Sequence, residues 1–257
     1  MGDTGQIAEL LADRDGVITI REALACGLTR KQIRGRVARG EWVTIVRGIY
    51  RSASHPMTEA LLVRAAVAAH RGVADRSTAA WWHGMIRTLP YPLTVAAASN
   101  PGATRWPLGR VDLIRRRYDD TDVETVNGLP VTSAPVTAVF AAATLHHGAR
   151  FLDRVLQEGT VTVAQLQAVL VRYEGSAGIA AARRLVAVAS EGSESEAGLP
   201  PPARRPLPRR PRQVQRPRRR RVAQEGLHLA RPDGATGGGH RGDRRHAERR
   251  DRGRLKK

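Results

Sequence analysis

The sequence predicts an α+β protein in three parts: an N-terminal winged helix-turn-helix, a mostly helical middle domain with a small β-sheet, and a disordered tail rich in Arg and Pro. Three observations support this fold class. Two short, closely spaced helical patterns precede a hairpin pattern, helical and strand patterns then alternate to about residue 190, and the composition changes at Gly198. We expect the parts to span residues 1–54, 55–190 and 191–257.

The first 54 residues have the element order of a winged helix. A helical pattern covers residues 5–15. Thr19 with Glu22 matches a capping box, which predicts the start of a second helix. Thr29 is a suitable cap for a third helix that runs to about Arg39. The two helices on either side of "CGLT" would form a helix-turn-helix.

A β-hairpin is expected next, in the segment "EWVTIVRGIYRS" at residues 41–52. Its β-prone residues flank Arg47-Gly48, which would lie at the turn. Three helices followed by a hairpin is the order of a winged helix.

The middle segment predicts a mixed domain. Strand patterns cover residues 93–98 and 111–116, and "VETVNGLPVTS" predicts a hairpin that turns at Asn127-Gly128 with type I′ geometry. Helices are expected over 57–70, 77–85, 135–146, 149–159, 162–173 and 178–189. Trp81-Trp82 is expected to pack in the core or between domains.

The positive charge is concentrated in the tail. The chain has a formal net charge of +19. Residues 198–257 hold 20 Arg or Lys against 5 Asp or Glu, whereas residues 1–197 hold 23 against 19. A large net positive charge favours polyanions such as nucleic acid as partners. The tail has no Phe, Tyr or Trp, and its apolar residues do not recur at helical or strand spacing. We therefore expect it to be disordered.

The third helix is the candidate DNA-binding element. In a helix-turn-helix, the first residues of the second helix meet base edges in the major groove. Arg and Lys suit guanine, Gln suits adenine, and either cation also suits phosphate. The expected base-facing residues are Thr29, Arg30, Lys31, Gln32 and Arg34. We expect Arg36 and Arg39 at phosphates, and Arg47 at the minor groove or the backbone. Gly35 would permit close approach to the sugar-phosphate wall.

Two other interpretations of the basic helix remain open. The cations could form a solvated helix face, which is the usual role of a charge run. A membrane-surface helix is less favoured, because Ile33 and Val37 make only a narrow apolar stripe. The capped helix pair and the hairpin with Arg at its tip favour double-stranded operator DNA as the partner.

The run "DGVITIREALACGLTRKQIRGRVARGEWVTIVRGIYRS", followed by "HPMTEALLVRAAVAAHRGVADRSTAAWWHGM", resembles the AbiEi-type antitoxin regulators of actinobacteria. "VNGLPVTSAPVTAVFAAA" is similar to the middle region of that group, so the resemblance covers roughly residues 6–190. It implies a DNA-binding transcriptional regulator, in some members an antitoxin that represses its own operon. The implied partner is a nucleotidyltransferase-like toxin.

Many members of that group continue into an endonuclease domain similar to very-short-patch repair enzymes. "EGSESEAG" resembles the entry to that domain, but residues 198–257 lack the apolar strands that would carry its metal-binding carboxylates. Our leading hypothesis is that the tail is a frameshift product. The rival hypothesis is a basic arm that holds nucleic acid electrostatically.

No catalytic chemistry is expected from the sequence. The eight His do not cluster, and the chain has no Cys pair, HExxH, Walker loop or Rossmann fingerprint. We therefore expect no enzyme activity, no metal site and no cofactor. The single Cys, the lack of a signal-peptide pattern and the lack of a bilayer-length apolar stretch predict a cytoplasmic protein without membrane contact. The remaining alternatives are a degenerate endonuclease-family protein and a partner-binding protein whose winged helix is only structural.

Overall fold

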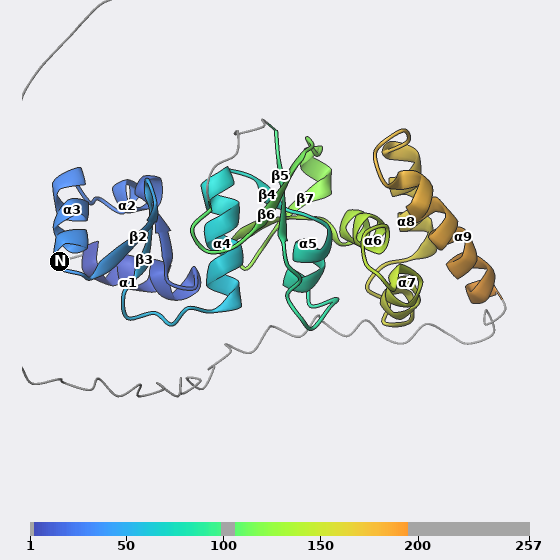
Figure 1. The fold of residues 1–257 in the computed structure, drawn as a ribbon, viewed down its shortest axis with the longest axis horizontal. Coiled ribbons are helices and arrows are strands. Elements are labelled where there is room, and N and C mark those ends of the chain that lie inside the picture. Colours follow the sequence, from blue (N-terminus) through green and yellow to red (C-terminus); the bar gives the residue numbers. More distant parts are fainter. Residues whose placement is uncertain (1–2, 99–105, 195–257) are drawn as a thin grey trace, which may run out of the picture. The chain divides into compact units, whose positions relative to one another are not determined.

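The computed structural model describes residues 3–98 and 106–194. Within these residues the chain forms nine α-helices and two β-sheets, which confirms the predicted α+β fold (Figure 1). The expected tail lies outside the described residues from residue 195 onward.

The N-terminal part is a winged helix. Its order is α1 (Asp3–Asp13), β1 (Val17–Thr19), α2 (Ile20–Ala25), α3 (Arg30–Ala38), β2 (Trp42–Val46) and β3 (Ile49–Ser52). The three strands form an antiparallel sheet in the order β1-β3-β2. The predicted helices and hairpin are confirmed. Strand β1 was not predicted, because three residues are too few to show a period of two.

The winged-helix core is small. Ile7 from α1, Ile18 from β1, Ile33 from α3 and Trp42 from β2 are all buried in it, together with Ala23 and Leu28. Trp42 also lies against Tyr50, with ring centroids 5.8 Å apart. Each of α1, β1, α2, α3 and β2 contributes only one buried side chain to this core.

A five-stranded mixed sheet forms the first half of the middle domain. Its strand order is β6-β5-β4-β8-β7, and the β4–β8 and β5–β6 pairs are parallel. The strands are β4 (Val73–Ala74), β5 (Leu93–Ala97), β6 (Val111–Arg115), β7 (Val123–Val126) and β8 (Leu129–Thr132). Helices α4 (Glu59–His70) and α5 (Arg76–Trp82) pack on the sheet, and a short 3-10 helix η1 (Asp120–Asp122) precedes β7.

Two details of this half test the sequence analysis. Asn127 and Gly128 have φ of 49° and 70°, as the expected type I′ turn requires. Trp81 is fully buried and Trp82 is 5% exposed, which confirms their packing role. Strand β4 was not predicted, because two residues between a helix end and a helix start carry no pattern.

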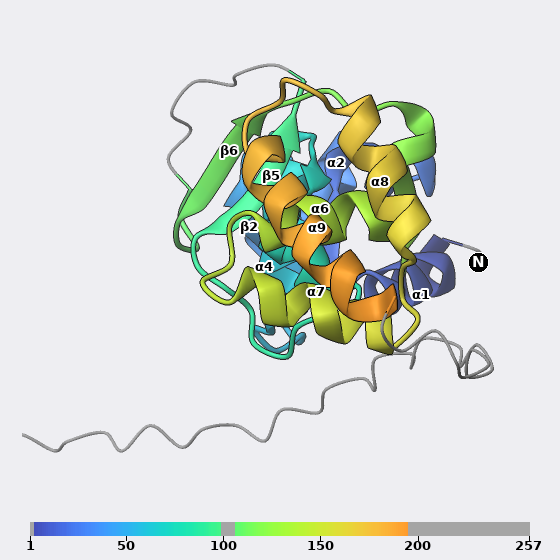
Figure 2. The same cartoon turned by 90° about the vertical axis from the view of Figure 1, so that its right-hand side faces the viewer.

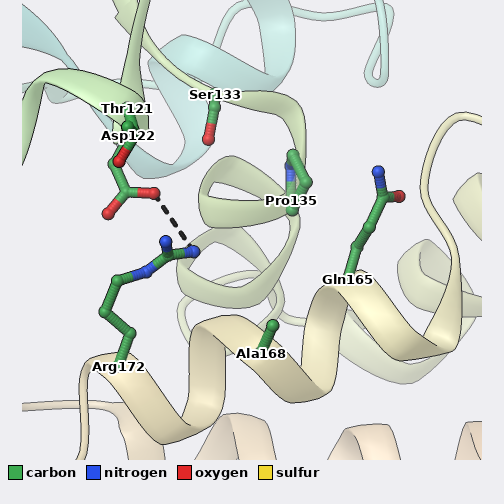
Figure 3. Close-up of a pocket in the computed structure, with 7 residues that line it drawn as sticks. All are labelled: Thr121, Asp122, Ser133, Pro135, Gln165, Ala168 and Arg172. Atoms are coloured by element: carbon green, nitrogen blue, oxygen red, sulfur yellow. Dashed lines mark ion pairs between the residues drawn. The ribbon is translucent and has the colours of Figure 1, made fainter.

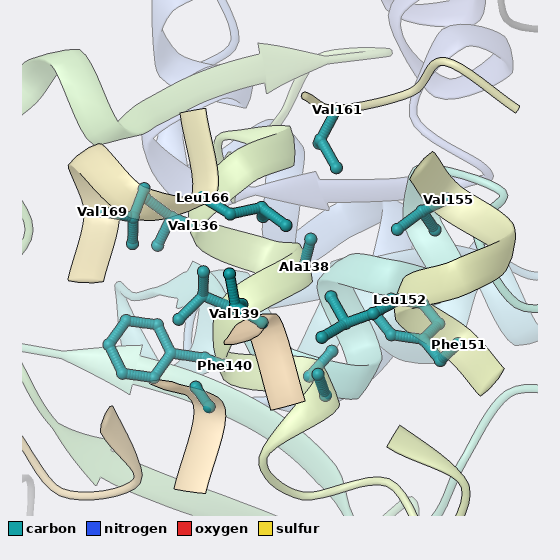
Figure 4. Close-up of a cluster of buried hydrophobic side chains, with 14 of the residues drawn as sticks. Val136, Ala138, Val139, Phe140, Phe151, Leu152, Val155, Val161, Leu166 and Val169 are labelled. Atoms are coloured by element: carbon teal, nitrogen blue, oxygen red, sulfur yellow. The ribbon is translucent and has the colours of Figure 1, made fainter. Parts of the chain in front are cut away.

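Four helices form the second half of the middle domain. They are α6 (Ala134–Ala142), α7 (Gly148–Gln157), α8 (Val163–Arg172) and α9 (Ile179–Glu194). Figure 2 looks onto α7, α8 and α9, which pack around α6. Every residue of α6 from Val136 to Ala142 is buried, and Phe140, Leu152 and Leu166 belong to the same buried cluster (Figure 4).

Helix α9 extends beyond the expected boundary of the middle domain. It ends at Glu194, so residues 191–194, which we assigned to the tail, are helical. Once a helix is nucleated, each further residue that becomes helical adds one backbone hydrogen bond. The polar segment can therefore prolong a helix that the preceding apolar face anchors.

Candidate nucleic-acid interface

Helix α3 is fixed to the winged helix by its apolar stripe and its N-terminal cap. Ile33 is 1% exposed and Leu28, just before the helix, is 4% exposed. The Thr29 side chain accepts a hydrogen bond from the Gln32 backbone N–H at 3.2 Å. These contacts define which face of α3 points to solvent.

The solvent face of α3 carries most of the predicted DNA-binding residues. Thr29, Arg30, Lys31, Gln32 and Arg34 are exposed, all within the first half of the helix or at its cap. Arg36 is partly buried and Arg39, at the C-terminal cap, is exposed. The structure thus brings seven of the eight predicted residues onto one short helix and its ends.

Arg47, the eighth predicted residue, lies at the tip of the β2–β3 hairpin and is exposed. The turn is anchored at Gly48, which has φ of +82° and whose carbonyl accepts a hydrogen bond from Ile20 N–H at 2.7 Å. A side chain at position 48 would also approach Ile20 Cγ2 to 3.3 Å. The wing is therefore held against the start of α2, and Arg47 projects from a fixed turn.

Gln32 has a structural role that the sequence analysis missed. Its Oε1 accepts hydrogen bonds from Thr29 N at 2.7 Å and Thr29 Oγ1 at 2.9 Å, so the two residues form a reciprocal capping box. A bidentate contact to adenine needs both the oxygen and the NH₂ of a Gln side chain. In this conformation only the NH₂ is available to DNA. The T-x-x-Q spacing was the signal for this role.

Glu41 is a second residue that the sequence analysis missed. Arg39 Nε donates to Glu41 Oε1 at 2.6 Å, and Arg36 Nη1 donates to Oε2 at 3.2 Å. The hydrogen bond from Arg39 is the main cause of a lowered pKa at Glu41. The Arg36 guanidinium also lies 5.5 Å from the centroid of the Trp42 ring. Both arginines expected at phosphates are therefore paired within the protein.

A shallow groove of about 300 Å³ lies far along the chain from this surface, between η1, the start of α6 and α8 (Figure 3). Its buried carboxylate, Asp122, accepts a hydrogen bond from Tyr173 Oη at 2.6 Å and pairs with Arg172 Nη2 at 3.3 Å. Both oxygens of Asp122 are thus engaged within the protein, where they link η1 to α8.

The buried carboxylate of Asp75 also has a structural explanation. Asp75 is the N-cap of α5 and accepts hydrogen bonds from Arg76 N at 2.7 Å and Tyr118 Oη at 2.8 Å. Burial raises the pKa of Asp75. Among the described residues, no three His, Cys, Asp or Glu side chains come together as metal ligands would. None of the helices in residues 3–98 and 106–194 has the length and hydropathy to cross a bilayer.

Comparison with known proteins identifies the N-terminal domain. No curated protein matches the chain. The crystal structure of the RV2827C protein from Mycobacterium tuberculosis is similar with a TM-score of 0.44 and 18% identity, covering 74% of this chain and 78% of that protein. That likeness is too distant to carry a functional argument. Residues 6–53 match the sequence model of a family described as "Transcriptional regulator, AbiEi antitoxin". This match covers the winged helix with its capped basic helix α3 and its β2–β3 hairpin, so this part of the chain is similar to the AbiEi antitoxin regulators.

Proposed function

We propose that this chain is a DNA-binding transcriptional regulator that inserts α3 into the major groove of its operator. In this proposal residues 1–54 are the DNA-binding domain, and the chain is the antitoxin and autorepressor of an AbiE-like toxin–antitoxin operon. The family match of residues 6–53 supports a regulator. The observation that carries the proposal is the group of unpaired cations at the start of α3.

These cations are unfavourable for the isolated protein. Arg30 and Lys31 occupy the first turn of α3, and with Arg34 they form no side-chain hydrogen bond or ion pair within the part of the chain that the structure describes. A helix N-terminus carries a partial positive charge, so each cation there costs about 0.3–1 kcal/mol when exposed. A solvated surface has no need for this arrangement. Phosphate groups and the acceptor atoms of guanine would compensate it.

The test is binding to DNA at several salt concentrations. A shortened chain of residues 1–194 avoids non-specific attraction by the basic tail and keeps every described element. It should bind the protein's own promoter more tightly than scrambled DNA. Arg30→Ala should lose this discrimination, by about 1–3 kcal/mol for each good base contact. Arg47→Ala should weaken binding to both DNAs alike and flatten the salt dependence.

Two results would count against this proposal. One is equal binding of promoter and scrambled DNA by the shortened chain, and the other is an Arg30→Ala variant that binds like the parent. The winged helix would then be only structural, and partner binding would become the leading function.

The antitoxin part of the proposal has a separate test. The neighbouring reading frame should encode a nucleotidyltransferase-like toxin, and its product should copurify with this chain after coexpression. An unrelated neighbouring frame, or a toxin whose growth inhibition this chain does not relieve, would leave a regulator without the antitoxin role.

A further inference from the structure

Arg64 is a buried cation in the middle of α4, where most of its neighbours in the helix are apolar. Its side chain is only 6% exposed. Nε and Nη2 both donate to Asp15 Oδ2, at 3.0 Å and 2.9 Å, and Nη2 also donates to the Asn127 carbonyl at 3.0 Å. The guanidinium lies 5.2 Å from the centroid of the Trp82 ring. One side chain therefore joins the α1–β1 turn of the winged helix to the β7–β8 turn of the middle domain.

Other contacts join the same two turns. Arg14, next to Asp15, donates a hydrogen bond to the Gly128 carbonyl, next to Asn127. Gly128 has φ of +70°, and a Cβ there would meet the Arg14 guanidinium at 2.6 Å. The positive φ of this turn therefore favours glycine, and a side chain at position 128 would displace the Arg14 guanidinium from the Gly128 carbonyl.

Apolar packing extends the junction. Leu61 and Ala65 of α4 lie in one buried cluster with Val17 of β1 and Ile49 of β3. Helix α4 therefore contributes side chains to the cores of both domains. The segment before α4, which follows the winged helix directly, does not separate the two domains as a free linker would.

The energetics favour a positioning role for Arg64 over a purely stabilising one. Burial lowers the pKa of this guanidinium, and Asp15 opposes that effect. Buried ion pairs often stabilise a fold no better than apolar residues of similar size, because both charges lose water. Their best-supported use is to select one arrangement among several apolar packings. Apolar contacts such as those of Leu61 and Ala65 are non-directional, whereas the hydrogen bonds of Arg64 require a particular geometry.

We propose that Arg64 is a positioning residue that couples the winged helix to the middle domain. Binding at either domain then changes the other, since coupling between two sites is reciprocal. In the regulator proposed above, DNA on α3 would stabilise the β7–β8 turn, and a partner on the middle domain would alter DNA binding. The DNA part rests on the proposed function, but the coupling itself can be measured without DNA.

Variants from each domain test the coupling in the full chain. Arg64→Met keeps the unbranched stem and removes the guanidinium. Asp15→Asn removes the partner charge at a residue with φ of 50°, a conformation that Asn tolerates well. Arg150→Met is the matched control, because Arg150 is exposed on α7 and has no side-chain partner among the described residues. Hydrogen exchange resolved by peptide measures the local opening of each domain.

Arg64→Met and Asp15→Asn should each raise exchange in residues 7–52 by about tenfold while peptides of α6–α9 keep their parental rates. The double variant should match the more severe single variant, because both single variants break the same Arg64–Asp15 pair. The control should exchange like the parent. Unchanged rates in residues 7–52, or equal acceleration in every peptide, would refute a positioning role. Asp15→Asn still decides the question if Arg64→Met does not fold.

Promoter DNA separates failure of this inference from failure of the proposed function. In the parent, added DNA should slow exchange in the peptide that contains residues 123–132, and in Arg64→Met and Asp15→Asn it should not. DNA that binds α3 without affecting that peptide would refute the coupling and leave the function intact. DNA that does not bind at all would refute the function, and the exchange rates without DNA would still decide the role of Arg64.

Discussion

The cations of α3 and of its C-terminal cap differ in whether an acid already neutralises them. Arg30, Lys31 and Arg34 have no acidic partner among the described residues, whereas Arg36 and Arg39 share Glu41. A phosphate would have to compete with Glu41 for either of these two arginines. In the proposed complex with DNA, Glu41 would therefore limit the non-specific affinity of the surface and would not affect base contacts at the start of the helix.

Glu41→Gln should strengthen binding to every DNA sequence. It removes a carboxylate that opposes phosphate and frees two arginines, so the salt dependence should steepen by about 0.9 for each further phosphate that the protein neutralises. The measurement is affinity for promoter and scrambled DNA between about 50 and 200 mM salt. Glu9→Gln, an exposed acid on α1, is the charge-matched control. An equal increase in the DNA affinity of the control would mean that the change in net charge alone, and not the release of Arg36 and Arg39, causes the effect.

Gly35→Ala should separate stability from DNA binding. Gly35 lies inside α3 with no left-handed φ, so Ala should stabilise the helix by about 0.8–1 kcal/mol. A Cβ would come 3.1 Å from Arg39 Nη1, the movable end of a long side chain. If Gly35 lies against the sugar-phosphate wall, affinity for DNA should fall although the melting temperature rises. A more stable variant with parental affinity would remove Gly35 from the interface.

At the scale of elements, capping residues define where the helices of the winged helix begin. Thr19-Glu22 and Thr29-Gln32 both form reciprocal capping boxes. The sequence predicted the first capping box and the Thr29 cap of the second. It predicted that Gln32 contacts DNA bases, for which Gln suits adenine, and not that it completes the cap. Sequence patterns alone could not distinguish a Gln that caps from one that binds a base, because both roles occupy the same turn.

Two variants at Gln32 separate these roles. Gln32→Ala should lower the free energy of unfolding by about 1 kcal/mol, because the cap is weakened. Gln32→Glu preserves the capping pattern and should keep the stability of the parent, but its charge should weaken DNA binding. Chemical unfolding and DNA affinity of the shortened chain provide the two readouts. Equal stability of the Ala variant and the parent would show that the cap contributes little.

The helices were predictable from the sequence, and the two shortest strands, β1 and β4, were not. Helices α4 and α7 through α9 bury enough regularly spaced apolar residues to show their period, whereas β1 and β4 have three and two residues. The contacts of Arg64 with Asp15 and Asn127 connect positions separated by 49 and 63 residues. No local pattern indicates such contacts. The visible signal was a lone Arg within the apolar segment "ALLVRAAVAA".

At the scale of the whole molecule, the buried side chain of His70 is expected to make stability depend on pH. His70, at the end of α4, is 6% exposed, and neither of its ring nitrogens has a hydrogen-bond partner among the described residues. Burial lowers its pKa, so the unfolded chain binds a proton more readily than the folded protein. Stability should therefore fall as the pH drops below about 6.5, the ordinary value for histidine.

His70→Leu should reduce this dependence. The comparison is the free energy of unfolding of parent and variant from about pH 7.5 to pH 5, a window that spans the ordinary histidine pKa. As the pH falls, the free energy of unfolding should decrease less in the variant than in the parent. A constant difference across this window would mean that other groups cause the acid sensitivity.

The whole chain should not cleave DNA. The resemblance implies an endonuclease domain in many relatives, but the sequence of residues 198–257 shows no apolar strand pattern of the kind that would hold its carboxylates. In the described residues, the buried carboxylates Asp75 and Asp122 are bound by tyrosine hydroxyls and are not grouped with other metal ligands. Metal-assisted cleavage needs carboxylates that converge on an ion with an open position for water. Purified full-length protein with Mg²⁺ or Mn²⁺ should therefore leave duplex DNA intact while binding it. Cleavage that a chelator abolishes and that persists through repurification would contradict this, and would identify the chain as an active member of the endonuclease-bearing group.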